Sequence, residues 1–458
     1  MQTDPLYVNE SKPHGSWFGA VELMDQNVFL LGSLGMETHV RLDRDFLEGF
    51  SESGMKDWLV ACGEENEVFD VYRQLLQDRF GMIERKPSPR VWCSWYSFYN
   101  NINEVTLNRL LEQLAEYPFD VIQVDDGWEQ KVGDWQANPR FSSGMQALAD
   151  NIHSKAKRAG LWLAPLLAVQ SSKLFHQHPH WFLKDQHGNW VSAGHNFGER
   201  LYALDTTHPE VLEWLKKLMK QVRKWGYDYV KLDFLYAAAL PGKHYEEMPR
   251  EMAYRQGMKT IREALGEDLY LLACGAPIFP SLGLCDALRI GPDVSGKWEN
   301  YRDSVILTNP AIPGARNAIR TTLHRLWLNP LVQVDPDVVY FSPKGNDLNA
   351  EQREYLQDLA LICNFRATSD IPEWFTPEER QFVKTFLTNK ANIQRKGRYT
   401  FLVNGKWVDF SDAIPLPSPL TGIRGLGRRL FCWLADHEWA LKLSDWASQR
   451  ARRGLGKS

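Results

Sequence analysis

The sequence predicts an α/β protein built on a (β/α)8 TIM barrel, with partial β-rich regions flanking the barrel at both ends. The chain has 458 residues, enough for a barrel of about 250 residues together with flanking segments. Eight short apolar runs alternate with amphipathic helical stretches across its central part. An open doubly wound sheet would also alternate, but no GxGxxG follows the first run. These observations together favour the barrel.

Residues 1–85 are interpreted as the β-rich remnant of an N-terminal sandwich, followed by a linking helix. Short apolar runs at 27–32 and 37–42, separated by Gly, Asn and Asp, indicate strands and turns. From Glu65 to Phe80 the apolar side chains take up helical spacing. The Lys86-Pro-Ser-Pro sequence then marks a boundary.

Residues 86–385 are predicted to form the barrel. The expected strands, in chain order, are 91–96, 121–124, 161–167, 229–234, 269–273, 287–290, 331–334 and 367–370. The expected helices are 104–116, 145–159, 210–225, 250–265, 317–327 and 350–363. In such a barrel the functional side chains lie at the carboxyl ends of the strands, where the loops begin.

Residues 386–458 are predicted to begin as a partial C-terminal β region and to end in a basic tail. The β character is clearest around Tyr399-Thr-Phe-Leu-Val. From Gly422 onward the sequence is rich in Arg, Gly and Trp and lacks strand alternation. We expect this tail to be weakly ordered or to reflect a truncation.

Composition and charge bear on partners and location. A formal net charge of −4 gives no electrostatic reason to expect nucleic acid or anionic lipid as a partner. Six cysteines lie far apart without a CxxC, which is typical of reduced thiols in an intracellular protein. No signal peptide and no run of about twenty apolar residues occurs. We therefore expect a cytoplasmic protein with no nucleic-acid or membrane partner, and leave a homo-oligomer open.

Two carboxylates about sixty residues apart each follow an apolar run. Asp233 ends Tyr229-Val-Lys-Leu-Asp, and Asp293 ends Leu288-Arg-Ile-Gly-Pro-Asp. At the carboxyl face of a barrel, both can converge on one bond. The chemistry that most often needs two opposed carboxylates is glycoside hydrolysis. Either Asp alone is more often a cap or turn residue, so the pair needs support from the other strand ends.

Other strand ends carry polar side chains that suit a sugar site. Asp125 and Asp126 follow the second strand and can accept hydrogen bonds from vicinal hydroxyls, although a capped turn is an equal alternative. Lys231 shares a face with Asp233 by the period of two, as a stabiliser of that carboxylate or as a structural ion pair. Arg289, in the sixth strand, can orient the substrate or the acid.

The ordered set of motifs resembles glycoside hydrolase family 36, the melibiase or α-galactosidase group, which is related to family 27. The resemblance covers roughly residues 65–385. The matching elements are Trp95-Tyr96, Asp125-Asp126-Gly-Trp, Gly133-Asp-Trp, Gly160-Leu-Trp162, Leu204-Asp205, Lys231-Leu-Asp233, Cys274-Gly275 and Arg289 to Asp293.

This resemblance implies a retaining α-galactosidase that hydrolyses terminal α-linked galactose without a metal or organic cofactor. Asp233 would be the nucleophile and Asp293 the general acid/base, with their carboxyl groups about 5–6 Å apart. By the same resemblance the α-galactoside would be bound by Asp125, Asp126, Trp162, Lys231, Cys274 and Arg289.

Two departures from the family pattern leave the sugar preference open. Leu166-Leu167 follows Pro165, where the family often has an acidic residue, and Phe234-Leu-Tyr follows Asp233, where many bacterial members carry Asn-Arg. Both changes make the rim of the site more apolar. The alternatives are a raffinose-synthase-like α-galactosyl transferase, an α-N-acetylgalactosaminidase and an inactive carbohydrate-binding remnant.

Two further groups of polar residues are assigned a lower weight. His176, His178 and His180 resemble a metal cluster by composition, but Pro179 breaks the spacing, so no metal is expected. Asp335-Pro-Asp337 ends the seventh strand and is interpreted as structural rather than as part of the site.

Overall fold

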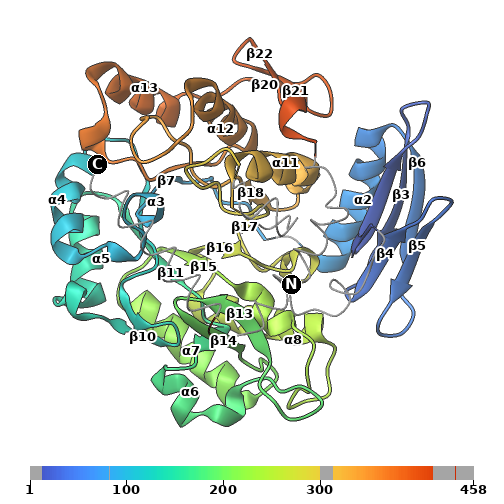
Figure 1. The fold of residues 1–458 in the computed structure, drawn as a ribbon, viewed down its shortest axis with the longest axis horizontal. Coiled ribbons are helices and arrows are strands. Elements are labelled where there is room, and N and C mark those ends of the chain that lie inside the picture. Colours follow the sequence, from blue (N-terminus) through green and yellow to red (C-terminus); the bar gives the residue numbers. More distant parts are fainter. Residues whose placement is uncertain (1–12, 82, 300–312, 416–438, 440–458) are drawn as a thin grey trace.

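A single curled sheet of eight parallel strands forms the centre of the molecule (Figure 1). The computed structural model describes residues 13–81, 83–299, 313–415 and 439. The strand order is β18-β17-β16-β15-β11-β8-β7-β19, so strands adjacent in the barrel sequence are also adjacent in the sheet. The strands are β7 (Arg90–Cys93), β8 (Val121–Val124), β11 (Arg158–Leu163), β15 (Tyr229–Leu232), β16 (Tyr270–Cys274), β17 (Ala287–Arg289), β18 (Gln333–Asp335) and β19 (Arg366–Thr368).

The two outer strands of this sheet, β18 and β19, meet through the segment that follows β18. A parallel bridge joins Val339 to Thr368. The Val339 N–H donates to the carbonyl of Ala367 at 2.8 Å, and the Thr368 hydroxyl donates to the carbonyl of Val339 at 2.8 Å. These contacts join the two outer strands and close the sheet into a barrel. All eight predicted strands are present, and the (β/α)8 prediction is confirmed.

Helices surround the barrel and bury one apolar face each against it. They are α4 (Glu104–Leu114), α5 (Gly144–Ser154), α7 (Pro209–Lys224), α8 (Arg250–Leu265), α11 (Ala315–Arg325), α12 (Ala350–Cys363) and α13 (Pro377–Thr388). In α7 the buried residues Val211, Leu215, Met219 and Val222 recur at helical spacing. None of the helices in the described residues is long and apolar enough to cross a membrane.

Several boundaries differ from the expectation from sequence, and two of them change the type of element at a residue. The predicted helix 145–159 ends at Ser154, and Arg158 already begins β11, because the apolar spacing of the helix continues into the buried strand. The first predicted strand, 91–96, ends at Cys93, and Trp95 begins the short helix α3 (Trp95–Phe98). After β16 only a four-residue helix, α9 (Ile278–Ser281), precedes the next strand.

Two insertions extend from the barrel at the carboxyl ends of its strands. After β8 comes the hairpin of β9 (Glu129–Lys131) and β10 (Asp134–Ala137). Between β11 and α7 lies a three-stranded sheet with order β12-β14-β13, together with α6 (Lys173–Gln177). Its strands are β12 (Leu167–Val169), β13 (Ser192–Asn196) and β14 (Glu199–Ala203).

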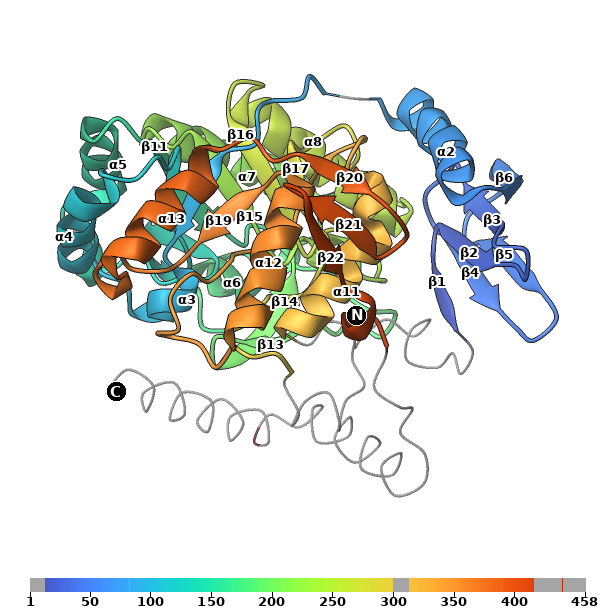
Figure 2. The same ribbon diagram turned by 90° about the horizontal axis from the view of Figure 1, so that it is seen from above.

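The N-terminal region consists of two three-stranded antiparallel sheets, ordered β1-β4-β5 and β2-β3-β6. Its strands are β1 (His14–Ser16), β2 (Phe18–Glu22), β3 (Val28–Ser33), β4 (Thr38–Leu42), β5 (Leu47–Ser51) and β6 (Trp58–Gly63). The helix α2 (Glu65–Phe80) follows at the residues where helical spacing was predicted. Figure 2 shows this region at one side of the barrel.

Aromatic side chains join the N-terminal region to the barrel. Trp17 stacks on Phe279 of α9, with ring centroids 5.0 Å apart. Phe18 and Phe69 both contact Trp327, which lies in the 3-10 helix η5 (Leu326–Leu328), at 5.1 and 5.0 Å. The N-terminal region is therefore packed against the barrel through buried apolar surface.

The C-terminal β region is a three-stranded antiparallel sheet of β20 (Ile393–Arg395), β21 (Thr400–Val403) and β22 (Lys406–Asp409). It begins later than residue 386 because α13 continues to Thr388. Asn404 and Gly405 form the turn between β21 and β22, both with positive φ. Apart from Trp439, the predicted basic tail from Gly422 lies outside the described residues.

Candidate active site at the carboxyl end of the barrel

The candidate residues lie at one end of the barrel because the strands are parallel and in register. Trp162 of β11 pairs with Lys231 of β15. Cys274 of β16 pairs with Arg289 of β17, and Arg289 pairs with Asp335 of β18. Residues that end parallel strands meet at the same rim, which is where barrel enzymes place functional side chains.

A buried ion pair joins the second strand to the fourth. The Lys231 ammonium lies 3.0 Å from Asp125 Oδ2. Gln123 Nε2 also donates to Asp125 Oδ2, at 2.6 Å. Although burial opposes the charged form, the Asp125 carboxylate raises the pKa of Lys231 well above its ordinary value. The direct partner of Lys231 is thus Asp125, and the Asp233 carboxylate contributes less to its charge.

Asp126 has a different environment from its neighbour Asp125. Its side chain is buried, and burial together with the carboxylate of Glu129 raises its pKa well above the ordinary value. Glu129 also accepts a hydrogen bond from the Gly127 N–H at 3.2 Å, which holds the loop after β8. The two adjacent acids therefore have different partners: Asp125 pairs with the Lys231 ammonium, whereas Asp126 lies beside a carboxylate and favours its neutral form.

Asp233 directly follows β15, and its carboxylate is held by two donors. Its Oδ1 accepts the N–H of Phe234 at 2.7 Å, and its Oδ2 accepts Trp162 Nε1 at 3.2 Å. Phe234 has the left-handed backbone conformation, with φ 53° and ψ 29°. Trp162 is only 1% exposed, so its indole positions Asp233 and its face is not open to a sugar.

Asp293 lies beyond β17 and carries a raised pKa. Its side chain is 41% exposed at the open mouth of the barrel, and protein groups enclose it on the remaining sides. This enclosure and, next, the charge of Asp337 raise its pKa to about 7, with a smaller contribution from Asp233. A carboxyl group with this pKa is partly protonated near neutral pH and can both donate and accept a proton.

Arg289 connects Asp293 to two carboxylates that were interpreted from sequence as structural. Its Nε donates to Asp335 Oδ2 at 2.6 Å, and its Nη1 lies 2.9 Å from Asp337 Oδ1 and 3.6 Å from Asp293 Oδ1. Asp337 also accepts hydrogen bonds from Tyr96 Oη and, at 2.8 Å, from the Val294 N–H. Asp335 and Asp337 therefore belong to the polar network of the site, and their position at a strand end was the signal for it.

Cys274 and Gly275 complete this end of the barrel. Burial raises the pKa of the Cys274 thiol well above its ordinary value, and the charge of Asp233 acts in the same direction, so the thiol is neutral. Gly275 has φ 58°, and a Cβ at this position would lie 3.6 Å from Asp233 Oδ1. Glycine here permits the backbone conformation beside Asp233.

Of the three clustered histidines, His180 is the one that meets other potential metal ligands among the described residues. Its ligand atom lies within 4.8 Å of those of His208 and Glu210. His208 Nδ1 accepts the Glu210 N–H at 3.2 Å, and Glu210 accepts Trp181 Nε1 at 2.8 Å. The first of these hydrogen bonds caps the N-terminus of α7 and the second fixes the Glu210 side chain, so the cluster has a structural explanation.

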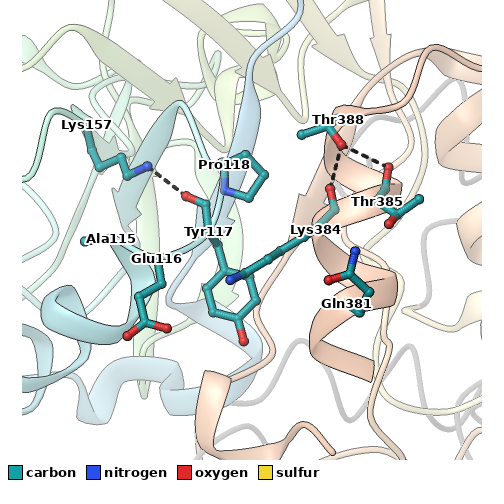
Figure 3. Close-up of a pocket in the computed structure, with 9 residues that line it drawn as sticks. All are labelled: Ala115, Glu116, Tyr117, Pro118, Lys157, Gln381, Lys384, Thr385 and Thr388. Carbon is teal, nitrogen blue, oxygen red and sulfur yellow. Dashed lines mark hydrogen bonds between the residues drawn. The ribbon is translucent and has the colours of Figure 1, made fainter. Parts of the chain in front are cut away.

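A shallow depression is formed by other residues of the barrel (Figure 3). It is formed by residues 115–118, which precede β8, by Lys157, which precedes β11, and by one face of α13. Lys157 Nζ donates to the Tyr117 carbonyl at 2.8 Å, and Lys384 Nζ lies 5.2 Å from the centre of the Tyr117 ring. Because these segments lead into the amino ends of the strands, the depression is separate from the carboxyl-end site.

Comparison with known proteins identifies relatives that are described as α-galactosidases. The Melibiase family model matches residues 57–267. The chain is 26% identical over 220 residues to α-galactosidase 1 of Pediococcus pentosaceus and 29% identical over 192 residues to a probable α-galactosidase C of Aspergillus oryzae. These matches cover 44% and 38% of this chain but only 29% and 24% of those relatives. The chain thus spans less than a third of the length of these curated relatives.

Solved structures extend the comparison to almost the whole chain. The α-galactosidase TtGalA of Thermus thermophilus, solved in complex with p-nitrophenyl α-D-galactopyranoside, is 45% identical, with a TM-score of 0.85. The match covers 90% of this chain and 84% of that one. The family 36 α-galactosidase AgaA of Geobacillus stearothermophilus, at 16% identity and a TM-score of 0.55, shares the fold over 81% of this chain and 57% of its own.

Proposed function

We propose that this chain, which belongs to glycoside hydrolase family 36, the melibiase or α-galactosidase family, is a retaining α-galactosidase that releases terminal α-linked galactose. The observation that carries the proposal is the pair of carboxyl groups at one mouth of the barrel, held in different environments. Asp233 accepts two hydrogen bonds, whereas Asp293 has its pKa raised to about 7. Two carboxyl groups whose environments differ in this way suit the roles of nucleophile and general acid.

In the proposed mechanism Asp233 attacks C1 of the α-galactoside while Asp293 protonates the departing oxygen. The covalent galactosyl group on Asp233 is then attacked by water, which Asp293 deprotonates, and galactose leaves with its α configuration retained. The hydrogen bonds from Phe234 and Trp162 hold the Asp233 carboxylate in a fixed orientation. A pKa near 7 lets Asp293 serve first as acid and then as base.

The remaining polar groups are proposed to bind the sugar or to position the two acids. Asp125, Asp126, Lys231 and Cys274 would line the galactosyl subsite. Arg289 would orient Asp293, with Asp335 and Asp337 fixing the guanidinium. The solved complexes of the Thermus thermophilus enzyme with an aryl α-galactoside and with stachyose support galactosides and oligosaccharides as the substrate class.

The first test compares the parent chain with Asp233→Ala on an aryl α-galactoside. The variant should lose at least about three orders of magnitude in kcat, because the covalent step needs the carboxylate. Added azide should restore turnover and yield the β-galactosyl azide, since the small anion attacks the face that Asp233 vacates. Asp185→Asn, in an exposed turn, serves as the matched control and should keep parent activity. Equal turnover in Asp233→Ala and parent would contradict the assignment.

Product analysis separates hydrolysis from its nearest alternative. The first-formed galactose should be the α anomer, as seen by proton NMR before mutarotation, which a retaining enzyme requires. A galactosyl transferase would instead give mainly a new oligosaccharide at moderate acceptor concentrations. A separation of about 5–6 Å between the carboxyl groups of Asp233 and Asp293 stays a prediction of the retaining mechanism. A cytoplasmic location likewise stays a prediction.

A further inference from the structure

The insertion between β11 and α7 contains a tight hairpin turn between β13 and β14. The first residue of this turn is one that rarely adopts the backbone conformation it requires. β13 and β14 pair through Asn196 and Glu199, so Phe197 and Gly198 make the whole turn. Both have positive φ, 56° and 77°. Such type I′ turns favour Asn-Gly, because Asn tolerates the left-handed conformation and a bulky aromatic residue does not. Phe197 therefore carries backbone strain that other contacts must offset.

The ring of Phe197 packs against two residues beside Asp233, Trp162 and Phe234. Its centroid lies 6.2 Å from the ring of Trp162 and 5.6 Å from that of Phe234. Trp162 donates to the Asp233 carboxylate, and Phe234, which follows Asp233, is itself left-handed with φ 53°. Strained backbone at bulky residues is uncommon and gathers at functional sites. Here two strained phenylalanines meet beside the same carboxylate.

Both strands of the hairpin are anchored near its tip. Tyr236, in the 3-10 helix η4 (Leu235–Ala239) after Asp233, donates its hydroxyl to the Ala193 carbonyl at 2.6 Å. On the other strand, Glu199 accepts the Ser171 N–H at 2.9 Å. Tyr236 thus holds one strand of the hairpin beside the segment that follows Asp233, and Ser171 ties the other strand to the rest of the insertion.

Phe197 also provides apolar surface that Trp162 does not. The indole of Trp162 is 1% exposed, since it lies 6.0 Å from the ring of Trp135 and against Phe197. Phe197 and Phe234 are partly exposed. Sugar C–H groups pack well on aromatic surface, and near Asp233 that surface belongs to the phenylalanines.

We propose that Phe197 contacts the galactosyl unit that becomes attached to Asp233, and that it binds this unit rather than the leaving group. This inference rests on the proposed function. The ring's contacts lie on β11 and directly after β15, on the Asp233 side of the mouth. The leaving group must lie beside Asp293, which follows β17. A contact on the galactosyl side acts on every substrate alike, whatever the leaving group.

The test uses Phe197→Asn, which suits the turn and removes the ring. We expect kcat/KM to fall about tenfold, by the same factor for p-nitrophenyl α-galactoside and for raffinose. The inhibition constant of free galactose, which offers only the galactosyl unit, should rise by that factor. Phe197→Tyr keeps the ring and should stay close to the parent.

A matched control lies in the same insertion, away from Asp233. Trp190 is 40% exposed and contacts Phe175 at 4.8 Å, so Trp190→Ala should leave kcat/KM and galactose inhibition unchanged. A loss confined to one leaving group, an unchanged Phe197→Asn enzyme, or equal losses in both variants would overturn the inference. A parent that neither turns over the substrates nor binds galactose in calorimetry would instead refute the proposed function, and the inference with it.

Discussion

Replacing Asp337 with Asn should move the pH profile, because Asp337 and Asp293 contact one nitrogen. Arg289 Nη1 lies 2.9 Å from Asp337 Oδ1 and 3.6 Å from Asp293 Oδ1, so these oxygens are at most 6.5 Å apart, the sum of the two distances. In the proposed mechanism Asp293 must be protonated before the bond breaks. Enclosure by the surrounding protein groups, and next the charge of Asp337, hold the pKa of Asp293 at about 7 even though part of its side chain is exposed.

The magnitude follows from Coulomb's law. Two unit charges about 6.5 Å apart interact with about 2.5 kcal/mol at an effective dielectric constant of about 20, or roughly two pKa units. Because the Asp293 side chain is 41% exposed, solvent screening reduces this, and we expect a shift of about one unit. Removing a neighbouring negative charge makes ionised Asp293 less unfavourable, so its pKa should fall from about 7 to about 6.

The assay is the pH dependence of kcat/KM on a substrate with a sugar leaving group, whose departure needs the proton. The rate of a general-acid reaction falls as pH rises through the pKa of the acid, so the alkaline limb should move about one unit to lower pH. Asp150→Asn removes the same formal charge from the exposed face of α5 and should leave the profile in place. An unmoved limb, or one shifted to higher pH, would refute the reasoning.

Two further predictions concern stability. Trp17→Ala removes the stack on Phe279 and a hydrogen bond to Glu251, so the free energy of unfolding measured in urea should fall by about 2–3 kcal/mol. Phe46 is 49% exposed, so Phe46→Ala should change that free energy little. Equal stability of both variants would contradict the packed interface. Lys231→Met leaves Asp125 buried without its cation and should lower the free energy of unfolding by about 3–5 kcal/mol in the same measurement. Adding Asp125→Asn to that variant should restore part of the loss. A Lys231→Met variant as stable as the parent would show that the pair is not charged.

The sequence predicted the barrel and the rim residues because strand ends follow from local patterns. Asp125, Lys231, Asp233 and Arg289 each come at or just after an apolar run, and parallel strands bring such positions to one rim. Which residues face each other across that rim depends on side-chain directions that local patterns do not contain. Lys231 was expected to act on Asp233, two residues away, yet its ammonium pairs with Asp125, 106 positions away in the chain.

The same limit explains the network around Arg289. Asp335 and Asp337 satisfied the strand-end criterion, but a strand-end Asp is more often a capping residue, so the pattern alone favoured a structural role. Their place in the site depends on the guanidinium of Arg289, which pairs with Asp335 and Asp337 from the neighbouring strand. A criterion that considers adjacent strand ends together would have predicted the contact, since β17 and β18 pair directly.

The left-handed phenylalanines could not be predicted, because local preference opposes them. At Phe197 the turn alone would select Asn, as it does at Asn404 in the hairpin of β21 and β22, where no site lies nearby among the described residues. Tertiary contacts with Trp162 and Phe234 must therefore offset the strain at Phe197. Sites where local preference and the fold disagree are where function most often resides. If Phe197→Asn proves more stable than the parent yet binds galactose less tightly, the strain is retained for binding and not for folding.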